Sequence, residues 1–113
     1  MQIEGTNITM IRGDSETITI TMRDPSGNKV DFIDGDTVYF TVKDSTLTQR
    51  KILQEVITDF IEGTALISLI PSDTRGLRPK DYMYDIQLTR DGDIVTTIVK
   101  PSKFTILGDV TYE

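Results

Sequence analysis

The chain has 113 residues, a net charge of −6, and neither cysteine nor histidine. Its length suits a single domain, and its negative charge opposes attraction to nucleic-acid phosphates or to an anionic membrane surface. Without cysteine there is no disulfide or thiolate nucleophile, and without histidine the usual general base and the commonest metal ligand are missing.

The N-terminal part predicts two strands separated by a turn. Residues Asn7–Ile11 are expected as an edge strand, and Arg12-Gly13-Asp14 supplies the turn that follows. The segment Glu16–Met22 then alternates apolar and polar residues, which is typical of a strand buried on one face. Its inward residues are Ile18, Ile20 and Met22. A dense turn signal of Pro, Gly and Asn follows at 24–28.

The next confident strand is Thr37–Lys43, after a short candidate strand at Val30–Ile33. One face carries Val38, Phe40 and Val42, and the opposite face carries Thr37, Tyr39 and Thr41. The segment Arg50–Asp59 fits a strand or a helix, because its apolar spacing satisfies both periods. We interpret it as a strand and keep the helix as the alternative.

The middle of the chain predicts a strand that leads into one helical turn. Thr64–Ile70 alternates again and contains many β-forming residues. Pro71 ends this strand because it cannot donate a ladder hydrogen bond. Ser72 is placed to cap a short helical turn that ends at Gly76.

The C-terminal part predicts a hairpin and a final irregular strand. Tyr82–Thr89 alternates with Tyr82, Tyr84, Ile86 and Leu88 on one face, and Asp91-Gly92 marks a tight turn before Ile94–Val99. Pro101 interrupts the last segment, which resumes at Phe104–Leu107. This strand is therefore expected to be bent, bulged or at an edge.

About seven or eight strands at this spacing predict an all-β, immunoglobulin-like antiparallel sandwich with one short helical turn at Ser72–Gly76. One domain is expected to span 1–113, with 1–5 and 108–113 as candidates for loose ends. Tyr82 and Tyr84 follow the crossover at the place where such sandwiches anchor a tyrosine hydroxyl to nearby backbone.

No catalytic, cofactor-binding or metal-binding residue is predicted, and we expect no enzymatic activity. Asp34-Gly35-Asp36 and Asp91-Gly92-Asp93 invite a calcium hypothesis, but their spacing does not match a 12-residue calcium loop, so solvated turns are preferred. Arg12-Gly13-Asp14 is the tripeptide that adhesion proteins present to integrins, yet Gly and Asp are also what turns select.

Six segments carry a family resemblance: Ile11–Ile18, Gly35–Val42, Ile70–Thr74, Tyr82–Leu88, Thr96–Val99 and Pro101–Ile106. Taken in order, they resemble the N-terminal immunoglobulin-like module of phage baseplate upper proteins and related small structural proteins from phages and prophages of Gram-positive bacteria. None of these residues carries chemistry, so the likeness concerns fold and strand sequence.

The resemblance implies a virion structural protein of the tail, the baseplate or the head accessories, with other virion proteins as partners. Self-association is compatible with it, whereas nucleic acid and membrane are not expected as partners. No secretory signal is visible, so assembly in the bacterial cytoplasm is expected. The alternative is an adhesive module that binds a ligand or carbohydrate, because the same scaffold supports that function.

Overall fold

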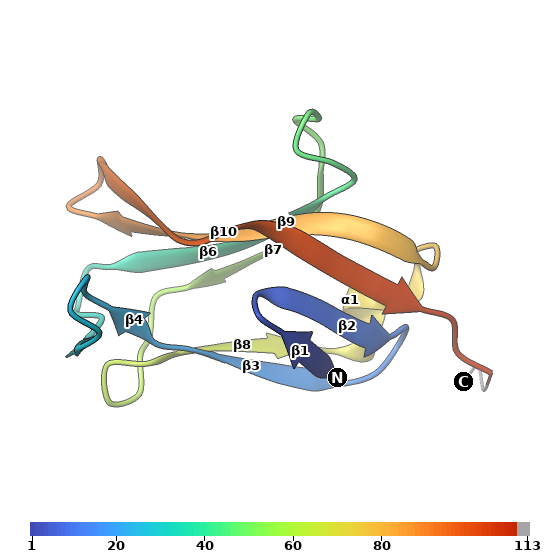
Figure 1. Cartoon of the computed structure of the whole chain (residues 1–113), viewed down its shortest axis with the longest axis horizontal. Helices are drawn as coiled ribbons and strands as arrows, with labels where there is room; N and C mark the ends of the chain where they lie inside the picture. Colours follow the sequence, from blue (N-terminus) through green and yellow to red (C-terminus); the bar gives the residue numbers. More distant parts are fainter. Residues whose placement is uncertain (111–113) are drawn as a thin grey trace.

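The computed structural model describes residues 1–110, and within them it contains ten strands and one helix. Six strands form one sheet, in the order β1-β2-β10-β9-β6-β7. Their bounds are Gln2–Glu4 (β1), Asn7–Ile11 (β2), Ile94–Leu107 (β10), Lys80–Arg90 (β9), Thr37–Lys43 (β6) and Lys51–Ile57 (β7). A second sheet pairs β3 (Glu16–Ile20) with β8 (Ala65–Leu69), and β4 (Met22–Arg23) pairs with β5 (Lys29–Val30). Figure 1 shows the two larger sheets stacked as layers, which is the predicted all-β sandwich.

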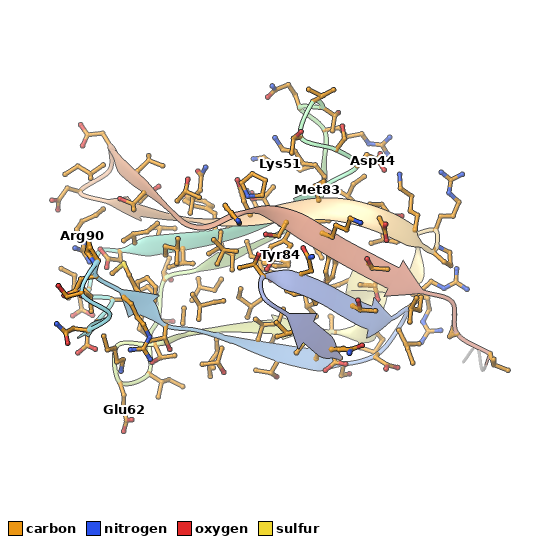
Figure 2. All side chains as sticks on the ribbon, in the orientation of Figure 1. Asp44, Lys51, Glu62, Met83, Tyr84 and Arg90 are labelled. Atoms are coloured by element: carbon orange, nitrogen blue, oxygen red, sulfur yellow. The ribbon has the colours of Figure 1, made fainter. Side chains whose placement is uncertain are left out.

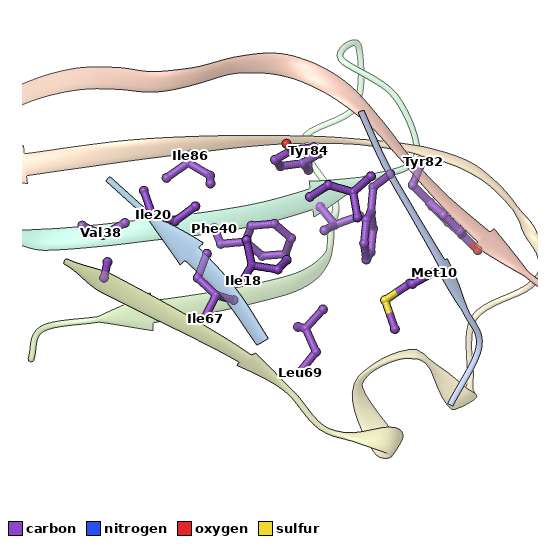
Figure 3. Close-up of a cluster of buried hydrophobic side chains, with 14 of the residues drawn as sticks. Met10, Ile18, Ile20, Val38, Phe40, Ile67, Leu69, Tyr82, Tyr84 and Ile86 are labelled. Atoms are coloured by element: carbon purple, nitrogen blue, oxygen red, sulfur yellow. The ribbon is translucent and has the colours of Figure 1, made fainter. Parts of the chain in front are cut away.

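The core lies between these layers and follows the predicted alternation. Val38, Phe40 and Val42 of β6 have no exposed surface. Tyr84 and Ile86 of β9 and Ile18 and Ile20 of β3 are also buried (Figure 3). Leu88 of β9 is buried as well. Phe40 packs against Tyr84 and against Phe104 of β10, with ring centroids 5.3 and 5.9 Å apart. Burial of one face of β3, β6 and β9 therefore holds the two layers together.

The first strands differ from the sequence expectation. The segment Asn7–Ile11 was expected at a sheet edge, but β2 lies between β1 and β10. β2 runs parallel to β10, from the pair Ile8 and Phe104 to the pair Ile11 and Leu107, so the sandwich is not antiparallel throughout. β1 pairs with β2, so 1–5 is not simply a loose end. Strand neighbours this far apart in sequence cannot be deduced from alternation alone.

Short strands explain why ten appear where seven or eight were expected. The predicted strand Glu16–Met22 is divided into β3 and β4. The predicted strand Val30–Ile33 contributes only Val30, through β5, because the chain then turns and the amide of Phe32 bonds to the carbonyl of Gly63 at 3.0 Å. Phe32 instead stacks on Phe60, with ring centroids 5.0 Å apart.

The two uncertain segments of the sequence are both strands. β7 pairs antiparallel with β6 along its length, which settles Arg50–Asp59 in favour of a strand. β10 is continuous through Pro101, with register shifts between Thr97 and Val99 and between Val99 and Ser102. The last strand was expected to be bent, bulged or at a sheet edge; the structure shows the bulge, and β10 lies inside the sheet between β2 and β9.

The helix α1 spans Pro71–Arg75, and Gly76 follows its end. Ser72 does not cap it, because Ser72 lies inside the first turn. The Asp73 carboxylate instead accepts a hydrogen bond from the backbone N–H of Ile70 at 2.8 Å. An acid three residues into the helix reaches back to the capping residue in this way and displaces the predicted serine cap.

The predicted tyrosine anchors are present at the start of β9. The Tyr82 hydroxyl donates to the carbonyl of Arg78 at 2.7 Å, four residues upstream. This bond closes the corner where the chain passes from α1 into the large sheet, as in immunoglobulin-like sandwiches. The Tyr84 hydroxyl donates to the carbonyl of Thr6 and so holds the turn between β1 and β2 against the core.

Candidate functional site

A groove of about 590 Å³ crosses the outer face of the six-stranded sheet. Figure 2 shows two of its lining residues, Lys51 and Met83, on the side of this sheet turned away from β3 and β8. Its floor comes from the outward residues of β6, β7 and β9, which alternate with the core residues of the same strands. Figure 1 shows the β6–β7 loop and the β9–β10 hairpin rising from this face. Ser45 and Thr46 line the groove from the loop, and Gly92 and Val95 line it from the hairpin.

The ladder registers place the floor residues in rows across the strands. Asp85 of β9 lies opposite Thr41 of β6, which lies opposite Gln54 of β7. In the next row Gln87 lies opposite Tyr39. Neighbouring strands are about 4.8 Å apart, so hydroxyl, amide and carboxylate groups stand at regular short intervals. The Gln54 amide donates to the Thr41 hydroxyl at 2.9 Å, which fixes one of these rows.

Asp85 is the one carboxyl among the described residues that line the groove. Burial raises the pKa of the Asp85 carboxyl, and the nearby positive charge of Lys43 opposes that rise. The groove therefore does not contain a pair of carboxyl groups of the kind that glycosidases use. The arrangement suits reversible binding by hydrogen bonds.

The walls of the groove are fixed by local contacts. Lys80 of β9 forms an ion pair with Asp44, at the base of the β6–β7 loop, with Nζ and Oδ1 2.9 Å apart. Inside that loop the hydroxyls of Ser45 and Thr48 accept backbone hydrogen bonds. In the hairpin, Asp91 and Gly92 have φ of 56° and 81°, the left-handed pair that a tight hairpin turn needs. The predicted Asp-Gly hairpin is thus confirmed.

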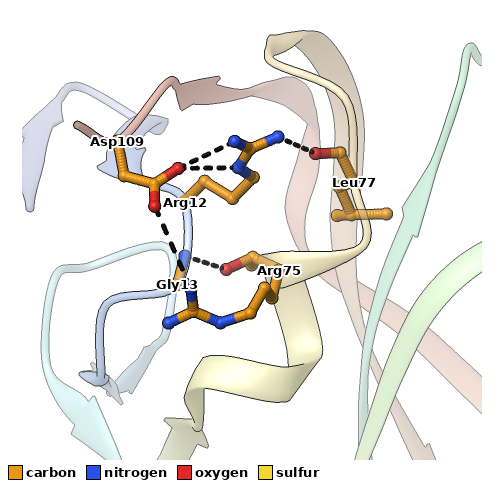
Figure 4. Close-up of polar contacts among 6 residues, drawn as sticks. Arg12, Gly13, Arg75, Leu77 and Asp109 are labelled. Carbon is orange, nitrogen blue, oxygen red and sulfur yellow. Dashed lines mark hydrogen bonds and ion pairs between the residues drawn. The ribbon is translucent and has the colours of Figure 1, made fainter. Parts of the chain in front are cut away.

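The tripeptide Arg12-Gly13-Asp14 is not displayed as an integrin ligand would be. The Arg12 guanidinium bonds to the Asp109 carboxylate at 2.8 and 2.9 Å, beside the carbonyl of Leu77 (Figure 4). Arg75 lies on the other side of Asp109, at 3.9 Å. Arg12 therefore ties Asp109, just after β10, to the β2–β3 turn. Within the expected loose end 108–113, Asp109 is thus held in place and Val110 is exposed, while 111–113 lies outside the described residues.

The turn acids do not gather into a calcium site. Both oxygens of Asp36 accept hydrogen bonds from Arg90, at 2.8 and 2.7 Å, and one also accepts from the amide of Ile33. Within residues 1–110, no group of three or more acids is arranged to hold a metal ion. Asp91 and Asp93 are exposed at the hairpin turn.

Sequence reasoning found the outward face of β6 but not the groove. Alternation placed Tyr39 and Thr41 opposite the core, yet it gives no sign that the β6–β7 loop stands up as a wall. The order of strands also decides which rows form, and that order comes from long-range pairing. The position of the loop and the order of the strands are therefore known only from the folded chain.

No helix in the part of the chain that the structure describes is long and apolar enough to cross a membrane. Comparisons of the chain with models of protein families, with curated proteins and with solved structures found no match.

Proposed function

We propose that the chain is a non-enzymatic assembly module of a tailed phage or prophage particle, in its tail, its baseplate or its head accessories. The strand segments that resemble phage baseplate modules support this proposal, and so does a sandwich fold whose groove holds a single acid. The structural observation that carries it is the open edge at β7.

β7 ends the six-stranded sheet and has β6 as a neighbour on one side only. Its seven residues therefore present backbone groups to which another strand can pair. The opposite edge, β1, has only three residues. Val56 on β7 is 52% exposed, an apolar residue at the open edge. The longer edge is the better docking site for a strand of a neighbouring subunit.

A shallow hollow of about 320 Å³ adjoins the same edge. It lies between β7 and β8, and its lining includes Val56 and Ile57 from one sheet and Leu66 from the other. A partner that adds a strand to β7 can place one of its side chains in this hollow. Backbone pairing supplies affinity and such a pocket supplies specificity. The partners are therefore other virion proteins or further copies of the chain.

The test is mass spectrometry of particles purified from the strain that encodes the chain, because an assembly module co-purifies with the virion. The chain is expected at a fixed ratio to the other tail or head proteins. Val56→Lys places a charge on the open edge and is expected to reduce incorporation strongly. Ser26→Lys, in the exposed turn between β4 and β5, is the matched control and leaves incorporation unchanged. Absence of the chain from particles contradicts the proposal.

A further inference from the structure

The groove floor offers hydrogen-bonding groups that the fold itself does not use. Gln54 and Thr41 form the one side-chain hydrogen bond between floor residues in the described part of the chain. Asp85 and Gln87 lie between them and the hairpin, partly buried and directed outward from β9. A hydrogen bond to a ligand is stronger when the acid or amide is partly desolvated than when it is fully hydrated.

Recognition on this floor must come from side chains. β6 is paired on both sides, with β7 and β9, and β9 is paired with β6 and β10. Their backbone groups are therefore engaged in the sheet, so an extended peptide cannot add as a strand here. The apolar lining comes from Met83, Val95 and Pro101 beside Tyr39, and most of the other lining residues are polar or charged. Its central row is Asp85, Thr41 and Gln54.

The charges at the groove do not select a strongly charged ligand. Lys43 and Lys51 line the groove together with Asp85, which leaves an excess of one positive charge there. The whole chain carries −6, which disfavours nucleic acids and acidic polymers. Tyr39 supplies one aromatic ring in the row next to Asp85. Hydroxyls, amides and one ring are the chemistry that binds an uncharged polyhydroxylated chain.

We propose that the groove binds a neutral oligosaccharide, with Tyr39 packing on a sugar ring and Asp85, Gln87 and Gln54 hydrogen-bonding its hydroxyls. The volume of about 590 Å³ falls in the range of small-molecule sites. The binding site lies on the sheet face and the assembly edge lies at β7, so the proposal goes beyond assembly and stands whether or not the chain enters a particle.

The test is a titration of the whole ¹⁵N-labelled chain, followed by NMR. The probes are cellotetraose, maltotetraose and the tetrasaccharide of N-acetylglucosamine, with tetragalacturonate as an acidic comparison. At least one neutral probe is expected to shift the amides of β6, β9 and the β6–β7 loop, with a Kd of about 1 mM or tighter. The acidic probe is expected to bind more weakly.

Variants locate the site. Asp85→Asn keeps the shape of the side chain and Gln87→Ala removes one amide, and each is expected to weaken binding at least about tenfold. Tyr39→Ala tests the aromatic platform in the same way. Thr19→Ala, on the other sheet, is the control and is expected to bind as the parent chain does. Thermal unfolding of every variant confirms that the fold is retained.

Two binding results would overturn the proposal, and one result with the variants would too. One is that no neutral probe shifts the groove amides. The other is that peptides selected from a random display library shift them while the sugars do not, which would make the groove a protein-docking surface. Binding that survives both Asp85→Asn and Tyr39→Ala also counts against the site, because it would place the sugar elsewhere.

Discussion

Arg90, at the end of β9, forms two hydrogen bonds with the carboxylate of Asp36, from Nε to Oδ1 at 2.8 Å and from Nη2 to Oδ2 at 2.7 Å. Asp36 is only 2% exposed, and it also accepts a hydrogen bond from the amide of Ile33 at 2.9 Å. This single acid therefore connects the turn before β6 to the hairpin that forms one wall of the groove. A buried carboxylate is stable only when it is paired in this way.

Replacing Asp36 with alanine is expected to lower the free energy of unfolding by about 2 to 3 kcal/mol, because buried hydrogen bonds to a charged group are lost together. Urea unfolding followed by circular dichroism measures the change. Asp34→Ala, two residues away and exposed, is the control and is expected to stay within about 0.5 kcal/mol of the parent chain. Equal effects of the two variants on the free energy of unfolding would show that the Asp36 hydrogen bonds do not stabilise the fold.

Stability is also expected to fall in acid. The hydrogen bond from Arg90 holds the pKa of Asp36 below its ordinary value of 3.8, and that from Arg12 does the same for Asp109. A depressed pKa in the folded state stabilises the fold above pH 3.8, and this contribution is lost as the pH falls through the lowered values. Urea midpoints measured from neutral pH downward give the profile. Asp36→Asn should flatten it, and an unchanged slope would contradict the assignment.

Glu55 of β7 gives the opposite pH dependence. Partial burial raises the pKa of Glu55, and the facing carboxylate of Asp73 in α1 raises it further. A raised folded-state pKa weakens the fold at neutral pH, and this penalty disappears as the pH falls below the ordinary pKa. Glu55→Gln is expected to stabilise the chain at neutral pH by up to about 1 kcal/mol after solvent screening, and to lose that advantage in acid.

Glu62→Gln is the control for Glu55→Gln, because it removes the same charge from an exposed turn. The two variants are compared by thermal unfolding at neutral pH and in acid. If both raise the melting temperature equally, relief of the net charge of −6 explains the effect, and the contact between Glu55 and Asp73 does not.

The bond from Tyr82 to the carbonyl of Arg78 is expected to stabilise the corner measurably. Tyr82→Phe removes the hydroxyl but keeps the buried ring, which is 3% exposed. The expected loss is about 1 to 1.5 kcal/mol, the usual contribution of a hydrogen bond whose acceptor is left without its partner. Tyr39→Phe, which alters a groove hydroxyl, serves as the comparison in the same unfolding assay and should change stability by much less.

The sequence predicts elements wherever burial alternates along one strand. Thr37–Lys43 and Asn7–Ile11 match β6 and β2 residue for residue. Alternation does not reveal partners, so the parallel pairing of β2 with β10 and the edge position of β7 came from the structure alone. In the sequence, Pro101 appears to interrupt the last strand. In the structure it lies in a bulge, where the register shifts between Val99 and Ser102 and pairing with β9 continues on both sides.

The candidate site was harder to predict than the fold. The groove floor mixes residues of three strands, and its individual residues, such as Gln54 and Asp85, look like ordinary surface positions in the sequence. The obvious short motifs led elsewhere, since Arg12 and Asp36 are used in structural contacts. Short motifs in turns consist of residues that suit the backbone geometry of the turn. Their polar side chains then form contacts that stabilise the fold and do not bind a ligand.

The account depends on the two faces of β6: one face in the core, the other on the groove. The chain has no cysteine, so single cysteines can be introduced and their reaction with a thiol reagent timed. Tyr39→Cys and Thr41→Cys are expected to react at least about 100-fold faster than Val38→Cys and Val42→Cys, whose thiols become accessible only when the fold opens. Similar rates at all four positions, or rapid reaction at Val38 and Val42, would contradict the sandwich and the groove together.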